Sequence, residues 1–228
     1  MKIGVIGCGF VGGAVMSGFK ELDPKSFDKN QKLSKNTFNE VLGQDYIFIC
    51  VPTPMDLSKG GECDLSILES CVKEISEVGT RGVLIIKSTV PVGTTKKYSE
   101  RHNVIHNPEF LTARNAVEDY AKAERNVVGG SQELCVDFIC FFEQCFPEIQ
   151  SIITSSDESE AIKYFSNVFL AYKVAYFNKI YDFCQAGGMN YNNVREGVTG
   201  DSRIGKSHTQ VPGIDNDRGF GGTCFPKD

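Results

Sequence analysis

One thiol near the end of the chain has the surroundings of a nucleophile. Cys224 lies in the run Gly219–Asp228, where several glycines allow a ligand to approach the backbone closely. Lys227 can lower the pKa of this thiol, and Asp228 offers a carboxylate that can handle a proton. The chain has nine cysteines, and a role as small buried hydrophobes suits most of them. We therefore expect nucleophilic chemistry at Cys224.

A lysine and an asparagine form a second candidate site. Lys163 and Asn167 are four residues apart in a predicted helix, which places them on one face among apolar neighbours. An ammonium and an amide that point together into an enclosed site can stabilise a developing oxyanion. A lysine that extends to solvent beside an asparagine bonded to the backbone explains the pair equally well. Both interpretations stay open at this point.

A glutamate follows the predicted strand 103–106. Glu109 stands where α/β folds bind ligands, at the carboxyl end of a strand, so it is a candidate general base. A helix-capping acid is the alternative. His102 and His106 are four residues apart, a spacing that suits zinc on a helix, but they flank this strand. We therefore expect no metal site.

Three glycines, Gly7, Gly9 and Gly12, join a predicted strand to a predicted helix. In a dinucleotide-binding fold, such glycines allow the tight turn, the approach of pyrophosphate and close packing of the helix on the strand. Asp28 lies 21 residues after Gly7, at the end of a predicted second strand. A carboxylate there binds the ribose hydroxyls and repels a 2′-phosphate, so we expect NAD rather than NADP. A structural glycine turn is the alternative.

The elements that must position these residues alternate along the first two thirds of the chain. Short apolar runs separated by amphipathic stretches of helical length predict a parallel sheet with crossover helices. The predicted strands are 2–6, 45–51, 82–87, 103–106 and 125–129, and the predicted helices are 10–20, 64–78 and 131–145. The fold class is therefore α/β, a Rossmann-type doubly wound and mainly parallel sheet.

The pattern changes near residue 155. Ser155–Glu158 resembles a capping box, and large apolar residues then recur at steps of three or four up to Gly187 and Gly188. The predicted helix is apolar around more than half of its circumference, which indicates a buried central helix or a dimer seam. We expect two domains, a dinucleotide-binding domain over 1–154 and a helical domain over 155–228.

Charge and cysteine content exclude several classes of protein. The formal net charge of −5 leaves no overall positive field to hold a nucleic acid or an anionic membrane. No segment has the 18 or so uninterrupted apolar residues of a membrane span. An odd number of cysteines without a Cys-x-x-Cys pair argues against a disulfide framework. We expect a cytoplasmic protein.

In combination, the motifs resemble the UDP-glucose and GDP-mannose 6-dehydrogenase family of nucleotide-sugar dehydrogenases. The resemblance covers nearly the whole chain, in order. Its motifs are Gly7–Gly12, Val51–Pro54, Lys87–Gly93, Asn107–Leu111, Glu160–Lys163 with Asn167, Arg203–Gly205 and Gly219–Asp228.

The resemblance implies a four-electron oxidation of the sugar C6 alcohol to an acid, with NAD as cofactor and UDP-glucose as the expected substrate. Cys224 would form a thiohemiacetal and then a thioester. Lys163 and Asn167 would hold the C6 oxygen. Asp228 and Thr89 would order a water for proton removal, and Glu109 would assist thioester hydrolysis.

The resemblance also implies binding contacts and a partner. Residues at the cofactor would be Val11, Asp28, Thr53, Thr89 and Lys227, in addition to the glycine loop. Gly213 and Gly221 would contact the sugar. The long helix, 156–187, would form a homodimer.

The chain departs from the family pattern in two ways. Ala113 and Arg114 stand where a second glutamate is usual, which removes an acid expected beside the cofactor. The family also continues past its Lys-Asp pair into a nucleotide-binding domain, which we expect to be absent here. Two other functions stay open, a non-catalytic NAD-binding dimerising module and a β-hydroxyacid dehydrogenase. The Cys224 loop argues against the latter, which does not require it.

Overall fold

The structure is a computed structural model that describes residues 1–213, 216–221 and 225–228. These residues form two compact units, Met1–Lys163 and Tyr164–Asp228. The division lies inside one continuous helix, α7 (Ser156–Ala186). The boundary expected from the sequence, between residues 154 and 155, stays a prediction about the folding domains.

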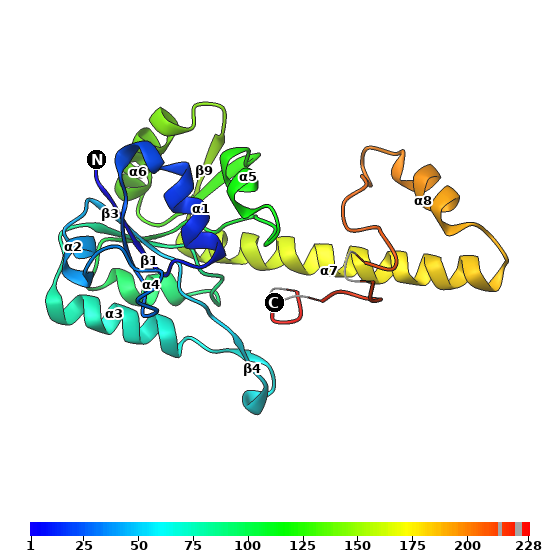
Figure 1. Cartoon of the computed structure of the whole chain (residues 1–228), viewed down its shortest axis with the longest axis horizontal. Helices are drawn as coiled ribbons and strands as arrows, with labels where there is room; N and C mark the ends of the chain where they lie inside the picture. The colour runs from blue at the N-terminus through cyan, green and yellow to red at the C-terminus, as the bar shows by residue number, and fades with distance from the viewer. Residues whose placement is uncertain (214–215, 222–224) are drawn as a thin grey trace. The chain divides into compact units, whose positions relative to one another are not determined.

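The first unit is built on a seven-stranded sheet (Figure 1). Its strand order is β2-β1-β3-β6-β7-β8-β9, and neighbouring strands are parallel except β7 and β8. The strands are β1 (Ile3–Ile6), β2 (Lys25–Phe27), β3 (Tyr46–Ile49), β6 (Val83–Ile86), β7 (Val104–His106), β8 (Arg125–Gly129) and β9 (Gln150–Thr154). The predicted α/β fold with a mainly parallel sheet is confirmed.

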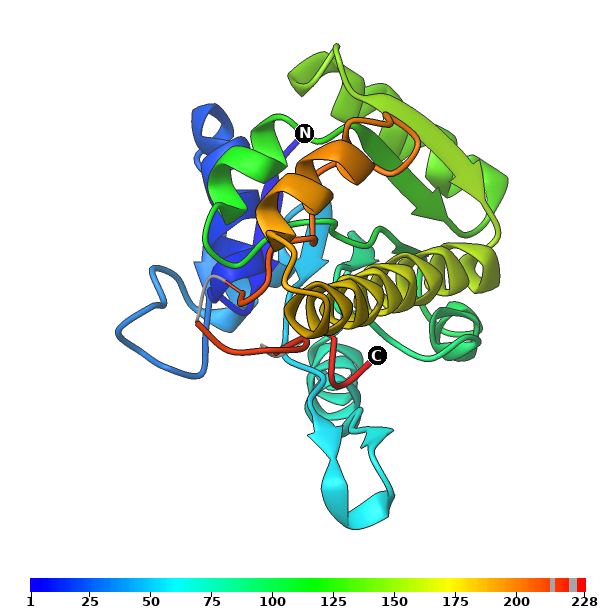
Figure 2. The same ribbon diagram turned by 90° about the vertical axis from the view of Figure 1, so that its right-hand side faces the viewer.

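Helices cover both faces of this sheet. Alternate strand residues face opposite sides: Phe48 packs with α1, α5 and α6, whereas Ile47 and Ile49 pack with α2, α3 and α4. The helices are α1 (Phe10–Gly18), α2 (Phe38–Leu42), α3 (Ser66–Val78), α4 (Thr94–Ser99), α5 (Ala116–Ala121) and α6 (Gln132–Cys145). A two-stranded hairpin, β4 (Met55–Asp56) and β5 (Glu62–Cys63), projects from this unit (Figures 1 and 2).

The second unit consists of most of α7, the helix α8 (Tyr191–Thr199) and the chain that follows. Its small core contains Phe177 and Cys184 of α7, Tyr191 of α8 and Val211. The Tyr191 hydroxyl donates a hydrogen bond to the carbonyl of Thr209 and thereby anchors the last segment. Within the described residues, no helix combines the length and the apolar character that crossing a bilayer requires.

The start of α7 follows the sequence prediction. The Ser155 hydroxyl accepts from the Glu158 backbone N–H at 3.2 Å, and the Glu158 carboxylate accepts from the Ser155 backbone N–H at 2.8 Å. These reciprocal bonds form the capping box expected from Ser155–Glu158. The capping box satisfies free N–H groups and sets where α7 begins.

Candidate functional site

The glycine loop has the geometry of a phosphate-binding turn. Gly7 has a φ of +89°, and a Cβ there would lie 2.7 Å from the carbonyl oxygen of Cys50. A Cβ on Gly12 would lie 1.9 Å from the carbonyl oxygen of Gly7. Around Gly9, by contrast, no described atom lies within 4 Å of a Cβ position. The loop is therefore closed against the sheet at Gly7 and Gly12 and open at Gly9, where α1 begins and presents its N-terminal N–H groups.

Asp28 stands beside this loop at the end of β2. One carboxylate oxygen accepts from the Cys8 backbone N–H at 2.7 Å, and the other accepts from the Asn30 backbone N–H at 2.7 Å. A carboxylate oxygen has two lone pairs, so each can accept a further ribose hydroxyl. Burial, followed by the charge of Asp28, raises the pKa of the Cys8 thiol. The thiol therefore stays protonated and adds no second negative charge beside the phosphates.

Two further cofactor candidates meet at the carboxyl edge of the sheet. The hydroxyl of Thr53, after β3, donates to the carbonyl of Thr89, after β6, at 2.7 Å. Ser88 makes a second link, from its hydroxyl to the carbonyl of Val51 at 2.5 Å. Thr53 and Thr89 are both buried. The loops that carry these residues are thus fixed to each other across neighbouring strands. Val11 is half-buried in the first turn of α1.

Glu109 and Lys163 form a buried ion pair. The Lys163 ammonium lies 3.1 Å from one Glu109 oxygen, and the two side chains are 3% and 11% exposed. The second Glu109 oxygen accepts from the backbone N–H of Leu111 at 2.6 Å. The Phe110 ring lies 5.4 Å from the Lys163 ammonium and 4.2 Å from the Arg125 guanidinium. The candidate base and the candidate oxyanion lysine are therefore direct partners, which the sequence analysis did not anticipate.

Phe110 and Arg125 were missed as site residues. Phe110 belongs to the motif Asn107–Leu111, but nothing in the sequence around Phe110 or around the basic residue at the start of β8 indicates a contact between a ring and a cation. Only the antiparallel pairing of β8 with β7 brings Arg125 over the ring of Phe110, where a cation–π contact stabilises both side chains.

Glu160, one helical turn before Lys163, is held by hydrogen bonds from the first unit's backbone. Its oxygens accept from the backbone N–H groups of Gly93 at 2.6 Å and Thr95 at 2.8 Å, and the residue is completely buried. Burial raises the pKa of this carboxyl, and the two hydrogen bonds oppose that effect. Glu160 thus joins the start of α7 to the loop that follows Thr89.

The second unit assembles a separate group of predicted site residues. The Asn167 amide donates to one Asp228 oxygen at 2.5 Å, and the Lys227 ammonium donates to the other at 2.5 Å. The Asp228 side chain is 1% exposed. The backbone N–H of Gly213 donates to the carbonyl of Asp217 at 2.8 Å, and Gly221 is exposed. Cys224, the predicted nucleophile, lies outside the described residues.

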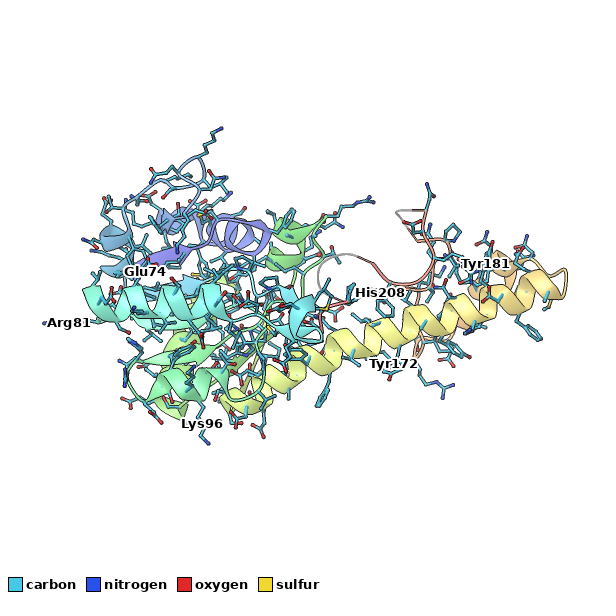
Figure 3. All side chains as sticks on the ribbon, turned by 90° about the horizontal axis from the view of Figure 1, so that it is seen from below. Glu74, Arg81, Lys96, Tyr172, Tyr181 and His208 are labelled. Carbon is cyan, nitrogen blue, oxygen red and sulfur yellow. The ribbon has the colours of Figure 1, made fainter. Side chains whose placement is uncertain are left out.

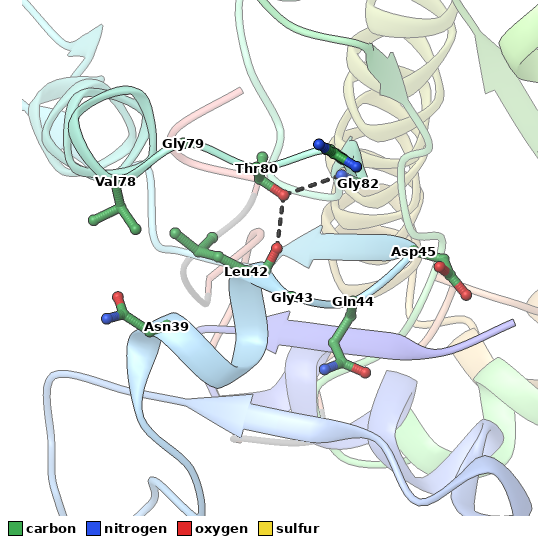
Figure 4. Close-up of a pocket in the computed structure, with 10 residues that line it drawn as sticks. Asn39, Leu42, Gly43, Gln44, Asp45, Val78, Gly79, Thr80 and Gly82 are labelled. Atoms are coloured by element: carbon green, nitrogen blue, oxygen red, sulfur yellow. Dashed lines mark hydrogen bonds between the residues drawn. The ribbon is translucent and has the colours of Figure 1, made fainter.

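A pocket of about 660 Å³ lies at the opposite edge of the sheet (Figure 4). It is lined by residues of α2 and the loop to β3, and by the end of α3 and the loop to β6, which includes Thr80 and Arg81. The Thr80 hydroxyl donates to the carbonyl of Leu42 at 2.7 Å and accepts from the backbone N–H of Gly82 at 3.0 Å. None of the predicted site residues lines this pocket. Parallel sheets bind ligands at their carboxyl edge, so we assign no part of the site to it.

Comparison of the sequence with known protein families identifies the family of this chain. Residues 22–145 match the NAD binding domain of the UDP-glucose/GDP-mannose dehydrogenase family, and residues 157–228 match its central domain. The chain belongs to the UDP-glucose/GDP-mannose dehydrogenase family. The family expected from the motifs and the NAD cofactor are confirmed, because the first unit corresponds to the NAD-binding domain of this dehydrogenase family.

Individual proteins that are similar to the chain in sequence or structure belong to the same family. The chain is 36% identical over 214 residues to UDP-glucose 6-dehydrogenase TuaD of Bacillus subtilis, an alignment that covers 88% of this chain and 44% of the relative. The structure of a UDP-glucose dehydrogenase from Pyrobaculum islandicum is similar with a TM-score of 0.86 at 27% identity, over 99% of this chain and 61% of that one. A GDP-mannose dehydrogenase from Pseudomonas aeruginosa has a TM-score of 0.78 at 26% identity, over 100% and 62%. The chain spans less than half the length of the curated relative it matches.

Proposed function

We propose that this dehydrogenase chain takes part in the NAD-dependent oxidation of the C6 alcohol of a nucleotide sugar, UDP-glucose, to the carboxylate. The observation that carries the proposal is that, in a member of this family, two polar residues of α7 each meet a carboxylate within their own unit. Lys163 is paired with Glu109, and Asn167, one helical turn later, is paired with Asp228. These are a cation, an amide and two carboxylates, the groups that an alcohol oxidation needs to hold oxygen and move protons.

The glycine loop fits the cofactor. Gly9 leaves room for a pyrophosphate, α1 offers N–H groups, and Asp28 retains acceptor capacity for ribose hydroxyls. Val11, Thr53, Thr89 and Lys227 complete the proposed set. Bound NAD supplies the acceptor for each hydride.

Lys163 and Asn167 hold the sugar C6 oxygen in this proposal. A lysine ammonium and an asparagine amide both carry N–H donors, the groups that stabilise negative charge on an oxygen. Both residues are buried, where fixed donors stabilise a developing negative charge more strongly than they would in water. Asp228 and Thr89 order a water that removes the hydroxyl proton.

Cys224 carries the second oxidation. The alcohol first loses a hydride and a proton and becomes an aldehyde. The Cys224 sulfur then bonds to C6 as the thiol proton is transferred to the aldehyde oxygen, and loss of a second hydride and of that hydroxyl proton leaves a thioester. Glu109 takes a proton from water as the water adds to C6. The carbon–sulfur bond then breaks, the departing sulfur takes this proton from Glu109 to regenerate the thiol, and the acid is released as a carboxylate and a proton. The support for this step is the Gly219–Asp228 sequence and the family.

The direct test is to follow NADH production by the chain with UDP- and GDP-sugars. We expect two equivalents of NADH per UDP-glucose, and we expect Cys224→Ser to abolish this two-step stoichiometry. Cys140→Ser, at an exposed cysteine, is the matched control and should leave turnover unchanged. Two-step turnover by Cys224→Ser would contradict the thioester. NAD binding without turnover by the unsubstituted chain would favour the non-catalytic module.

We further propose that the long helix pairs with a second copy of the chain. Five aromatic side chains on α7 are between 61% and 72% exposed: Phe165, Phe169, Tyr172, Tyr176 and Phe183. Their spacing of four, three, four and seven residues puts them on one face of the helix. Tyr181, which packs on Tyr191, lies on the opposite side from Tyr172 (Figure 3). A long helix with a continuous aromatic stripe can pack against its own copy by burying both stripes.

The oligomeric state tests this pairing. Phe169→Lys places a charge in the middle of the stripe and should convert a dimer into a monomer in analytical ultracentrifugation. Gln185→Lys, which adds the same charge at an exposed residue on the opposite face of α7, is the control. A monomeric unsubstituted chain, or a dimer that Phe169→Lys leaves intact, would contradict the pairing.

A further inference from the structure

Lys87 is a buried lysine for which the proposed reaction has no role. It directly follows β6, its backbone N–H donates to the carbonyl of Ile49 at 3.0 Å, and the residue is 4% exposed. Its ammonium donates to the side-chain oxygen of Asn107 at 3.0 Å and lies 5.5 Å from the centre of the Tyr120 ring. Within the described part of the chain, no carboxylate lies within 4.0 Å of this ammonium.

Such a position is unfavourable for a lysine. A buried ammonium loses its hydration, and a neutral amide with a ring face compensates for only part of that loss. Burial is the main reason that the pKa of Lys87 falls to about 8. The surrounding titratable groups act in both directions: Cys50 and Glu109 raise the pKa, and Lys163 lowers it. A methionine would fill the same space without this cost, so the ammonium itself must serve a purpose.

Asn107, the hydrogen-bond partner of Lys87, is held through both the oxygen and the nitrogen of its side-chain amide. The Asn107 oxygen accepts from Lys87, while its amide nitrogen donates to Asn126 at 2.7 Å and to the carbonyl of Val127 at 2.6 Å. Its backbone N–H donates to the carbonyl of Ile86 at 2.9 Å. Asn107 is therefore locked between β6 and β8. Pro108 follows with a restricted φ, and the next residue is Glu109.

We propose that Lys87 is a positioning residue, which holds Asn107 and thereby places the Glu109 carboxylate against Lys163. The inference rests on the proposed function, in which Glu109 and Lys163 act on the substrate. The route is short and consists of described contacts: Lys87 to Asn107, two backbone steps to Glu109, then the 3.1 Å ion pair to Lys163. When the Lys87 bond is lost, the Asn107 side chain keeps only the bonds of its amide nitrogen, and the turn that carries Glu109 is held less firmly against Lys163.

Two substitutions break the anchor from opposite sides. Lys87→Met removes the donor at nearly constant volume, and Asn107→Ser leaves an oxygen too short to reach it. We expect each to lower kcat roughly ten- to hundredfold while KM changes less than about twofold, because small displacements of catalytic groups act mainly on the reacting step. Because Asn107→Ser also removes the bonds of the amide nitrogen, the double variant should be no worse than Asn107→Ser alone. Lys122→Met, at an exposed surface lysine, is the control and should match the unsubstituted chain.

A second readout is independent of turnover. The side-chain ¹⁵N resonance of Lys163, assigned with Lys163→Arg, reports its pairing with Glu109, and Glu109→Gln supplies the reference for the broken pair. In Lys87→Met and Asn107→Ser this resonance should move toward the Glu109→Gln position. If Lys87→Met does not fold, Lys87→Gln, which also removes the ammonium and leaves Asn107 in place, tests the same link.

The outcomes separate the inference from the function on which it rests. An unchanged Lys163 resonance in a folded variant would overturn the positioning role, whatever happens to activity. An additive double variant would overturn it as well. A chain that turns over no nucleotide sugar, but whose Lys163 resonance moves as expected, would refute the proposed function and leave the positioning of Glu109 intact.

Discussion

The Glu109 carboxylate lies 3.1 Å from the Lys163 ammonium, and both side chains are almost completely withdrawn from solvent. Each charge therefore depends on the other for compensation. The pair also joins the loop after β7 to the first turns of α7. A residue expected to act as a base and a residue expected to hold an oxyanion are thus placed by a single contact.

Breaking this pair should destabilise the first unit. Glu109→Gln leaves the Lys163 ammonium buried without its carboxylate, and we expect a loss of about 3 to 5 kcal/mol in the free energy of unfolding. Urea denaturation measures this. Glu118→Gln, which removes the carboxylate of the exposed Lys122 pair, is the control and should have little effect. Equal losses of unfolding free energy in the two variants would show that the buried pair stabilises the chain no more than the exposed pair does.

Stability should fall in mild acid because of His106. Burial lowers the pKa of this histidine from 6.5 to about 3, and its ring nitrogen lies 2.8 Å from the Ser159 hydroxyl. As the pH falls below about 6.5, this histidine takes up a proton in the unfolded chain but stays neutral in the folded chain. The free energy of unfolding is therefore highest above pH 6.5 and decreases as the pH falls toward 3. Between neutral pH and about pH 5 the loss should be about 2 kcal/mol.

The measurement is urea denaturation of the chain and of His106→Asn at several pH values. The difference in unfolding free energy between the two should shrink in acid, because asparagine does not titrate. His102→Asn, at the partly exposed histidine, is the control and should shift this difference much less. A difference independent of pH would contradict a neutral buried imidazole.

Gly9 in the loop and Gly12 and Gly13 in α1 should respond differently to substitution by alanine. Gly12→Ala places a methyl group 1.9 Å from a carbonyl oxygen and should abolish both stable folding and NAD binding. Gly9→Ala meets no described atom within 4 Å, so it should fold normally but bind NAD more weakly, since the methyl group occupies the approach to the loop. Gly13→Ala, inside α1 and equally open, should raise stability by about 0.5 to 1 kcal/mol. Thermal denaturation and NAD calorimetry distinguish the three, and normal NAD affinity in Gly9→Ala would exclude a phosphate contact there.

Asp28 should select NAD over NADP. Asp28→Asn keeps the shape of the side chain but removes its charge, so NAD affinity should fall about tenfold and NADP affinity should rise. Titration calorimetry with both dinucleotides gives the ratio. Asp23→Asn, at an exposed aspartate paired with Lys25, is the control. An unchanged ratio of NAD to NADP affinity in Asp28→Asn would mean that another residue binds the ribose hydroxyls and selects the cofactor.

Elements with strong local patterns were predictable. The predicted strands that form β1, β3 and β6 each have four consecutive residues that are apolar or glycine, a pattern typical of a sheet buried on both faces. In β7 and β8 the apolar run is only two residues long. In contrast, β9 was missed: residues 150–154 are mostly exposed or half-buried and begin with Gln150 and Ser151, so they lack the apolar run of the inner strands. The helices α2, α4 and α5 were also missed, because five or six residues do not span two helical turns and so carry no clear periodicity.

The class of fold, the glycine loop with Asp28, the capped start of α7 and the family were evident from the amino-acid sequence. These features depend on residue types at short, regular spacings, so local chemistry is enough to reveal them. Three contacts became visible only in the folded chain: Glu109 with Lys163, Asp228 with Asn167, and the buried Lys87 with Asn107. Such contacts join residues far apart in the chain. Strand order and helix packing bring them together, and burial then makes a charged group depend on the partner it meets.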